Sequence, residues 1–405
     1  MLREIALKAK AALSKPAKYG VDVDLTTYNF KIPPRQLIGS LNELPDDVKR
    51  SAPSVGLEIT EAGRSGSYFQ IDASPVYVKS RVPGLTVMPL SEAINDRSFI
   101  DNYYWKAVDV DLDKFTAAAE LYGGKEGYVI IAGRNVVVEN PVQACLYMSE
   151  PRALQAPHNI IVAEEGSTLY VVTGCATRPR IAGLHAGVSE FYVKRNATVV
   201  FIMIHNWSRH THVRPRTGVV VEDGGTFISY YVNMGFTKSL QTFPNVYLRG
   251  AGAKAVLHTV ILGLGSSKID VGGFIALEAE GTSGEISSRV VAKDEVEVVA
   301  RGKIGGYARG GRGHVECSGL LLSKHSSIRA IPELEAKVKD VQLTHEAAIG
   351  KLAEEEVFYI QARGFTREEA VSMLIRGFLK VRMEGLPPIL EKYVNYVTEL
   401  TASKL

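Results

Sequence analysis

A turn-and-strand unit that recurs through the middle of the sequence decides the fold. It appears as EEGSTLYVV (164–172) and returns as KRNATVVFI (194–202), EDGGTFISY (222–230), GAGAKAVLH (250–258) and AEGTSGEIS (279–287). Each copy joins a turn of Gly, Asn or charged residues to a β-branched or aromatic run, and successive copies lie about 28 to 30 residues apart. This regularity predicts a solenoid. A parallel β-helix is the natural form, because each coil buries its apolar face only by stacking on the next.

The two flanks of this region have a different pattern. Residues 1–124 are mixed, with predicted helices over 2–13, 90–101 and 113–122. After about residue 344 the apolar period becomes helical, which predicts helices over 345–364, 365–385 and 387–400, the second starting with a capping box formed by Thr366 and Glu369. The prediction is a mainly β protein with an N-terminal α+β cap (1–124), a parallel β-helix core (125–343) and a C-terminal helical domain (344–405).

Composition excludes several classes of function. The 405 residues include 47 basic and 44 acidic residues, so no global field favours nucleic acid or an anionic membrane. The YARGGRGHVEC stretch (307–317) lacks the interleaved aromatic residues of a nucleic-acid binder. Three cysteines without a CxxC pair, no signal peptide and no membrane span predict a cytoplasmic protein that contacts neither nucleic acid nor membrane.

Cys317, His345 and Glu346 are the candidate metal-binding residues, because thiolate, imidazole and carboxylate side chains all bind iron. Cys317 and Glu346 lie about one repeat apart, which predicts neighbouring coils and a separation of about 5 Å. His345 and Glu346 are adjacent and point to opposite faces of a strand. Both serve one site only at a bend, a bulge or a subunit boundary, and a boundary between two copies is favoured.

The other two cysteines lie at repeat-like spacings from Cys317. Cys175 precedes it by about five repeats, or about 24 Å of stacked coils, and Cys145 precedes Cys175 by about one repeat. Equal coil lengths would place all three on one column, although a one-residue change in coil length reverses the face. Cys145 is interpreted as a core residue.

Three histidines, His205, His210 and His212, occur close together among arginines. They suggest a metal site, but no thiol or carboxylate accompanies them in the sequence. A solvated basic loop is therefore the prediction for this segment.

Two long blocks of sequence resemble the SufB/SufD family of iron–sulfur cluster assembly proteins. The more specific block is LTHEAAIGKLAEEEVFYIQARGFTREEAVSMLIRGF (343–378), and the other combines NIIVAEEGSTLYVVTGC (159–175) with LHAGVSEFYVKRNATVVFIMIHNW (184–207). The resemblance implies a right-handed parallel β-helix between helical N- and C-terminal parts. It also implies a homodimer, or a heterodimer with a SufD-like chain, formed through the β-helix, and a SufC-like ABC ATPase docked on the C-terminal helices.

The same resemblance implies roles for single residues. The pair His345-Glu346 is similar to the SufB-like branch, where the SufD-like branch typically has His-Gly. Cys317 then matches the cysteine implicated in nascent cluster assembly, with Glu346 beside it and His345 assisting, and Cys175 matches the cysteine that accepts sulfur from a donor protein. Thr344 departs from the family pattern, which often has Glu there, so one acidic ligand is missing.

The implied function is that of a scaffold rather than an enzyme. It would build a transient iron–sulfur cluster from iron and sulfide and pass it to apo-proteins, with a reduced flavin bound in some family complexes. The chain has no GxxxxGK[ST] loop, so ATP hydrolysis would belong to the partner.

Two alternatives remain open. In the first, the chain is a SufD-like structural subunit that positions the ATPase without holding the cluster. In the second, it is a β-helix polysaccharide lyase or hydrolase, which would need clustered acids on an exposed face; here the acidic residues are scattered.

Overall fold

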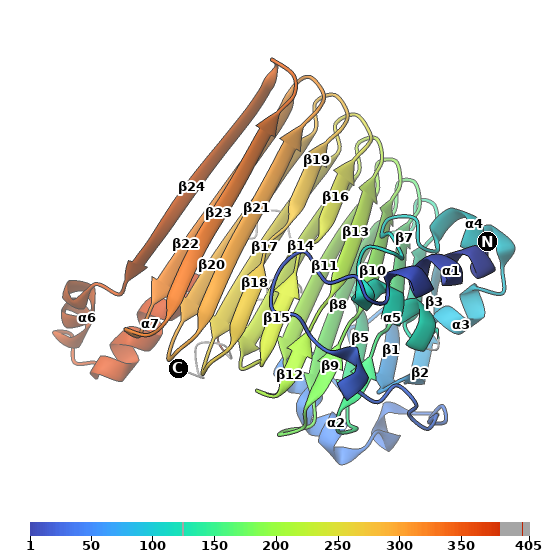
Figure 1. The fold of residues 1–405 in the computed structure, drawn as a ribbon, viewed down its shortest axis with the longest axis horizontal. Helices are drawn as coiled ribbons and strands as arrows, with labels where there is room; N and C mark the ends of the chain where they lie inside the picture. Colours follow the sequence, from blue (N-terminus) through green and yellow to red (C-terminus); the bar gives the residue numbers. More distant parts are fainter. Residues whose placement is uncertain (124, 381–398, 400–405) are drawn as a thin grey trace.

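The computed structural model describes residues 1–123, 125–380 and 399, and it confirms a mainly β protein. A β-solenoid of about eight turns forms the body, with an α+β region at its N-terminal end and helices at its C-terminal end (Figure 1). The predicted helix over 387–400 lies almost entirely outside the described residues. No helix in the described part is both long and apolar enough to cross a bilayer.

The first sheet runs the full length of the solenoid. Apart from the antiparallel β1–β2 pair, its neighbouring strands are parallel. In spatial order the strands are β2 (Ser74–Ser80), β1 (Gly66–Ile71), β5 (Val142–Met148), β8 (Thr168–Thr177), β11 (Thr198–Asn206), β14 (Thr226–Gly235), β17 (Lys254–Gly263), β20 (Ser283–Ala292), β22 (Gly311–Leu321) and β24 (Val341–Lys351). β1 lies in the predicted N-terminal α+β region and pairs in parallel with β5, so this region adds strands to the end of the solenoid sheet.

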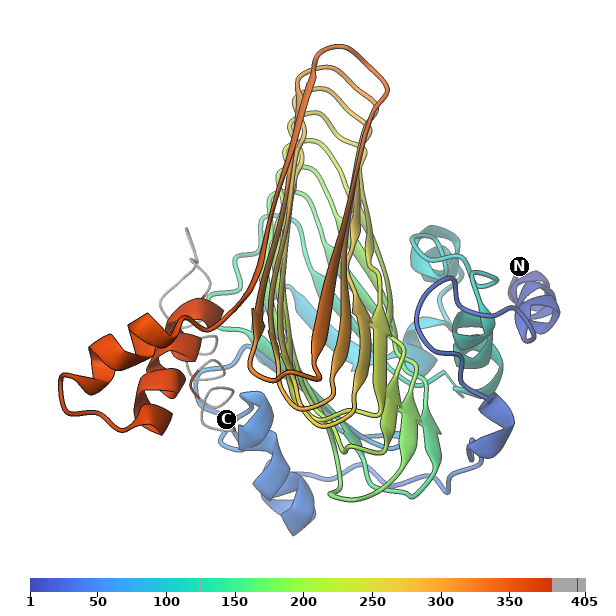
Figure 2. The same cartoon turned by 60° about the vertical axis from the view of Figure 1, so that its left-hand side comes forward.

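The second sheet is made of two columns that merge at β21 (Glu297–Gly306). One column contains β3 (Leu85–Pro89), β4 (Tyr128–Ala132), β7 (His158–Ala163), β10 (Val188–Val193), β13 (Arg216–Val221), β16 (Asn245–Leu248) and β19 (Phe274–Leu277). The other contains β6 (Ala153–Gln155), β9 (Gly183–His185), β12 (Thr211–Val213), β15 (Ser239–Thr242) and β18 (Lys268–Val271), and β23 (Ser327–Ala336) stacks on β21. Coils near the N-terminus therefore have three strands. The last coils have two long strands, and their cross-section is narrow (Figure 2).

The sequence repeat corresponds to the coil. Equivalent positions stack in register along the first sheet at Thr168, Thr198, Thr226, Lys254 and Ser283. The turn before each of these strands contains a residue in the left-handed conformation: Gly166, Asn196, Gly224, Gly252 and Gly281, with φ between 55° and 71°. Gly and Asn adopt this conformation at least cost, which explains why the turns recur with these residues.

Three apolar cores hold the molecule together. The largest lies inside the solenoid, between the two sheets. A second packs helices α1 (Leu2–Ala12), α3 (Leu90–Ala93), α4 (Arg97–Tyr103) and α5 (Lys114–Tyr122) against the outer side of β7 and β10. The third covers the outer side of the first sheet with η2 (Leu41–Glu43), α2 (Asp46–Ser51), η3 (Ala52–Val55) and α7 (Arg367–Leu379); one more short helix, η1 (Leu25–Thr27), lies in the N-terminal segment.

The C-terminal part corrects one prediction. The segment expected to be helical from residue 345 continues as strand β24 to Lys351, and helix α6 (Glu354–Gln361) begins only later. Backbone pairing with β22 along all of β24 outweighs the helix-forming residues of HEAAIG, because local propensity is weaker than tertiary pairing. The capping box of α7 is confirmed, with Glu369 N–H donating to Thr366 Oγ1 at 3.2 Å.

Candidate functional site

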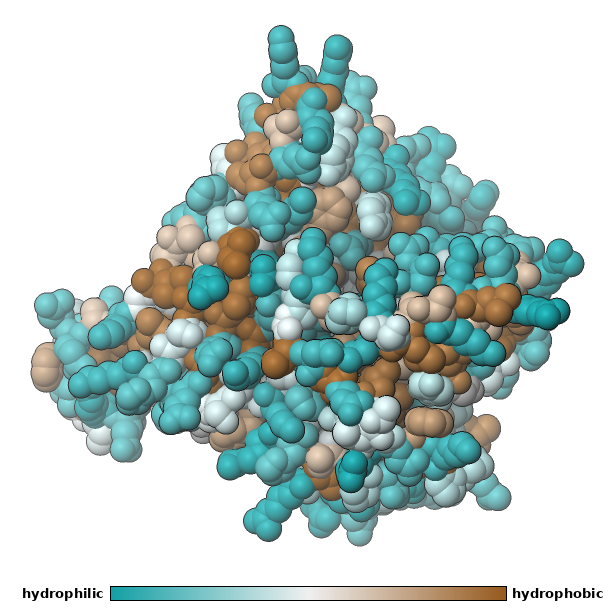
Figure 3. Space-filling view, in the orientation of Figure 1, coloured by the Kyte–Doolittle hydropathy of each residue, from teal (hydrophilic) through white to brown (hydrophobic). Residues whose placement is uncertain are grey.

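Among the described residues, no further coil stacks on the last coil of the solenoid. β24 pairs with β22 along one edge, and within the described part of the chain no strand pairs with the other. Most of its residues are exposed, and Figure 2 looks onto this end. Apolar residues gather near it on the surface in Figure 3, and the side chain of Ile349 is 40% exposed. An open strand edge is a template for pairing with another chain.

Cys317 lies on the inner face of β22, one coil from this open end. It is 2% exposed and belongs to the interior core together with Val315. In β24, Ala347 is the register partner of Cys317, and His345 is the register partner of Val315. Since side chains alternate along a strand, His345 shares the inner face with Cys317.

Glu346 lies on the other face. It pairs with Glu316 on the outer side of the sheet. The expectation that Cys317 and Glu346 lie on neighbouring coils is confirmed, but their expected direct approach within one chain is wrong. A one-residue offset in register reverses the face, which the repeat length alone could not resolve. His345 and Glu346 do point to opposite faces, as predicted from their adjacency.

The environment of Cys317 keeps its sulfur protonated. Burial, and after it the nearby Glu316 carboxylate, raises the pKa of the Cys317 thiol to about 11. The thiolate is the form that binds metal, so iron binding at this sulfur would release a proton. On the outer face, Thr344 Oγ1 lies 2.8 Å from His314 Nδ1, so Thr344 makes a local hydrogen bond.

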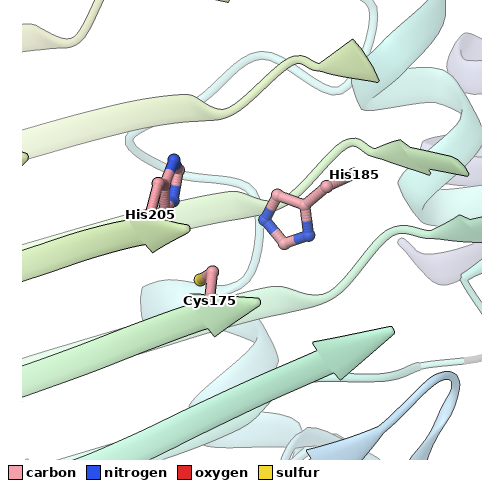
Figure 4. A group of neighbouring side chains, drawn as sticks. All are labelled: Cys175, His185 and His205. Carbon is pink, nitrogen blue, oxygen red and sulfur yellow. The ribbon is translucent and has the colours of Figure 1, made fainter. Parts of the chain in front are cut away.

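A second cluster lies inside the solenoid around Cys175. Cys175 at the end of β8, His185 at the end of β9 and His205 in β11 each offer one ligand atom, and these atoms all lie within 4.8 Å of one another (Figure 4). Cys175 and His205 are register partners on adjacent strands. All three residues are buried.

Burial controls the protonation of this cluster. It lowers the pKa of His185 to about 3 and that of His205 well below its ordinary value, so both imidazoles are neutral. It also raises the pKa of the Cys175 thiol well above its ordinary value. Neutral imidazole is the form that binds metal ions.

The prediction of a solvated histidine loop is therefore wrong in part. His210 is exposed, but His205 is fully buried and His212 is half-buried with Nδ1 2.5 Å from Ser239 Oγ. The arginines differ too: Arg209 is exposed, whereas Arg214 is fully buried and donates to the carbonyl oxygen of Val21 at 2.7 Å. Sequence reasoning missed His185. The distance of 30 residues from Cys175 to His205, one coil length, was a signal for the pairing of these two residues, but no spacing in the sequence pointed to His185.

The single column of three cysteines is not observed. Cys145 pairs with Gly174 rather than Cys175, and it packs in the outer core beneath η2 and η3. Burial raises its pKa to about 12, which agrees with the predicted core role. The register partners of Cys317, followed strand by strand toward the N-terminal end of the solenoid, end at Thr173. Thr173 lies two residues before Cys175, on the same inner face.

Polar side chains line this inner column between Cys175 and Cys317. The register positions from β8 to β22 are Thr173, Met203, Tyr231, Thr259, Ser288 and Cys317. Ser288 is fully buried, and its Oγ has no hydrogen-bond partner in the described structure. A cavity of about 40 Å³ between the sheets is lined by Met203, Tyr231 and Thr259 among others. The interior of the solenoid is therefore mostly polar along this column, and the cavity beside Met203, Tyr231 and Thr259 leaves it incompletely filled.

A surface pocket lies next to the buried cluster. Its volume is about 260 Å³, and Arg180 and Arg209 are among the residues that line it. Its lining also includes Ala176, which follows Cys175, and Asn206 and Trp207, which follow His205. The ring of Trp207 stacks near both imidazoles, with centroids 4.8 Å from His185 and 5.2 Å from His205. Trp207 thus separates the cluster from a basic opening.

Comparison with known proteins agrees with this architecture. Residues 146–378 match the family model "SUF system FeS cluster assembly, SufBD core domain". A protein of Methanothermobacter thermautotrophicus named iron-sulfur cluster assembly SufBD family protein is 40% identical over 393 residues, which cover 96% of each chain. Proteins of the same family name from Archaeoglobus fulgidus and Staphylococcus saprophyticus are 41% and 29% identical, covering 91% of this chain and 99% and 80% of theirs. With a matched core domain that covers most of the solenoid and relatives at 40% and 41% identity aligned over nearly their whole length, this chain belongs to the SufBD family of iron–sulfur cluster assembly proteins.

Proposed function

We propose that this chain is the scaffold subunit of a SUF-type complex, on which a nascent iron–sulfur cluster is built in the cytoplasm and then passed to apo-proteins. The observation that carries the proposal is the placement of Cys317 and His345 on one inner face at the uncovered end of the solenoid. The chain itself is not an enzyme in this scheme. The sequence has no GxxxxGK[ST] loop, and a SufC-like partner supplies ATP hydrolysis.

The proposed site is completed by a second chain. One thiolate and one imidazole do not fill the ligand positions of a cluster, and Glu346 faces away from Cys317 within the chain. Pairing of two open ends, either of two identical chains or of this chain and a SufD-like sister, brings a second ligand set to the same boundary. Incomplete thiolate ligation suits a cluster that must be released.

Sulfur enters this scheme at Cys175. A sulfur donor protein that carries a persulfide would dock over the basic pocket beside Trp207, and its outer sulfur would transfer to the Cys175 thiolate, which leaves the donor as a thiol. Two-electron reduction, for which a reduced flavin is the proposed source, would free this sulfur as sulfide, restore the Cys175 thiol and let the sulfide diffuse along the inner column toward Cys317. The unpartnered Ser288 hydroxyl and the small cavity beside Tyr231 and Thr259 support passage along this line. The buried position of Cys175 requires such an internal route.

The open end gives a direct test of the two-chain site. Replacing the exposed Ile349 by Lys places a charge on the uncovered edge, and we expect the two-chain species to dissociate at least tenfold more readily, about 1.4 kcal/mol. Light scattering coupled to size-exclusion chromatography measures the mass, and in-line absorbance reports the cluster. Iron and sulfide should leave the column with the two-chain species only.

Val137→Lys is the matched control, because Val137 is also apolar and is 59% exposed but lies near the other end of the solenoid. It should leave both mass and cluster unchanged. A reconstituted cluster carried equally well by a single chain would contradict the shared site. A chain that never carries a cluster would favour the SufD-like structural role.

The C-terminal helices offer the proposed docking surface for the ATPase. Phe358 and Tyr359 of α6 are 61% and 62% exposed, an unusual exposure for two adjacent aromatic residues. Phe358→Glu should weaken binding of a SufC-like ATPase at least tenfold in a calorimetric titration. Leu37→Glu, at an equally exposed apolar position of the N-terminal region, should have no effect. Equal binding by both variants would place the ATPase elsewhere.

A further inference from the structure

We propose that Cys175, His185 and His205 form a binding site for one divalent transition-metal ion inside the solenoid. The ion would take two imidazole nitrogens and one thiolate sulfur from the protein and keep one exchangeable ligand. This site lies about five coils from Cys317, outside the proposed cluster-assembly site, but it shares Cys175 with the proposed sulfur entry point. A Cys175 thiolate bound to the ion is not free to accept sulfur, so the ion would have to leave before sulfur enters.

The separation of the ligand atoms suits a single ion. In a tetrahedral site with metal–nitrogen bonds of about 2.0–2.1 Å and a metal–sulfur bond of about 2.3 Å, ligand atoms lie about 3.3–3.6 Å apart. The three atoms already lie within 4.8 Å of one another without an ion. Small side-chain rotations therefore complete the geometry, and no strand has to move.

The surroundings of His185 fix the tautomer that metal binding requires. Gln155 Nε2 donates to the carbonyl oxygens of Asp72 and Tyr147 at 3.0 and 3.2 Å, which turns its Oε1 toward His185 Nδ1 at 2.9 Å. An amide oxygen only accepts, so His185 Nδ1 carries the proton. The lone pair is then on Nε2, which points toward Cys175 and His205 (Figure 4).

The Nδ1 atom of His205, like that of His185, has a hydrogen-bond partner. Its Nδ1 lies 2.8 Å from the hydroxyl oxygen of Tyr231, while its Nε2 is fully buried and has no hydrogen-bond partner in the described structure. A buried polar atom left without a partner is costly and calls for an explanation. A tyrosine hydroxyl both donates and accepts, so the contact with Tyr231 is compatible with the tautomer that carries its proton on Nδ1. In that tautomer the Nε2 lone pair is free, and a metal ion would satisfy it.

The ligand set selects the class of ion. Imidazole and thiolate together favour borderline-soft ions such as Zn²⁺, Co²⁺ or Fe²⁺ over Mg²⁺ or Ca²⁺, which prefer oxygen. Binding would replace the Cys175 thiol proton by the metal and release that proton to solvent. The pocket beside Trp207 gives the nearest approach from the surface.

Cobalt titration of the full-length chain in sulfide-free anaerobic buffer tests the inference. We expect one Co²⁺ per chain, with a thiolate-to-cobalt charge-transfer band and the intense visible bands of a tetrahedral ion, and displacement by Zn²⁺. Cys175→Ser should abolish the charge-transfer band, and His205→Asn should weaken binding at least 100-fold. Gln155→Leu removes the hydrogen bond to His185 together with the two that Gln155 Nε2 donates to backbone carbonyls, and it should weaken cobalt binding 10- to 100-fold.

Two controls keep the outcome interpretable. Cys317→Ser and His212→Asn leave the three ligands in place and should bind cobalt like the wild type, and circular dichroism should show that each variant is folded. Competition with Fe²⁺ against Zn²⁺ then identifies the preferred ion. Loss of the cobalt spectrum in Cys317→Ser but not in Cys175→Ser, or no cobalt binding by the wild type, would overturn the proposal. The cluster-assembly proposal is tested separately, because it needs sulfide and Cys317.

Discussion

Glu190→Ala should destabilise the protein by about 3–5 kcal/mol, because this carboxylate holds the N-terminal region onto the solenoid. Glu190 is fully buried in β10 and accepts hydrogen bonds from the backbone N–H groups of residues 105, 106, 107 and 108. It also lies 2.7 Å from His158 Nε2. Alanine would leave these buried donors unpaired, and each such loss costs about 1–3 kcal/mol.

Urea unfolding followed by circular dichroism measures this effect. Glu222→Ala is the matched control, since Glu222 directly follows β13 of the same sheet but pairs with Lys194 at a site where its side chain is 44% exposed. Its loss should cost at most about 1 kcal/mol. Similar unfolding midpoints for the two variants would show that the backbone of residues 105–108 is held by other contacts.

Cys317→Ser should abolish cluster formation during anaerobic reconstitution with iron and sulfide. Serine keeps nearly the same volume on the inner face of β22, so the interior core is preserved, but a hydroxyl group is a poor ligand for iron. We expect bound iron, bound sulfide and visible absorption to fall at least tenfold. Protein folding should be unchanged in circular dichroism.

The other cysteines provide the controls. Cys145→Ala changes a thiol in the outer core and should leave the cluster intact. Cys175→Ser should also keep it when free sulfide is supplied, because free sulfide bypasses the proposed entry point. Loss of the cluster in all three variants to the same degree would show a general effect of the thiols on folding rather than a site at Cys317.

The sequence predicts the solenoid well because the coil is a local unit. A Gly or Asn such as Gly166 or Asn196 must supply the left-handed turn of each coil, and the strand that follows must carry β-branched residues. Both requirements recur at each repeat and are visible without any structure. The same logic correctly placed Cys317 and Glu346 on neighbouring strands.

What the sequence could not predict depends on register. Coils differ by one or two residues in length, so the repeat spacing predicts on which coil a residue lies but not which face of the sheet its side chain points to. Glu346 and Cys145 both lie on the face opposite to the one expected. Residues 345–351 of β24 are predicted as a helix, because the pairing of this strand with β22 is a tertiary contact. The thiol that accompanies His205 comes from the neighbouring coil, so no local pattern reveals it.

Mössbauer spectroscopy of the chain reconstituted with ⁵⁷Fe and sulfide, compared with its Cys317→Ser variant, tests the scaffold proposal most directly. We expect the signature of an iron–sulfur cluster in the wild type and only unbound or mononuclear iron in the variant. Identical cluster signatures in both chains would place the cluster on other residues and contradict assembly at the open end of the solenoid.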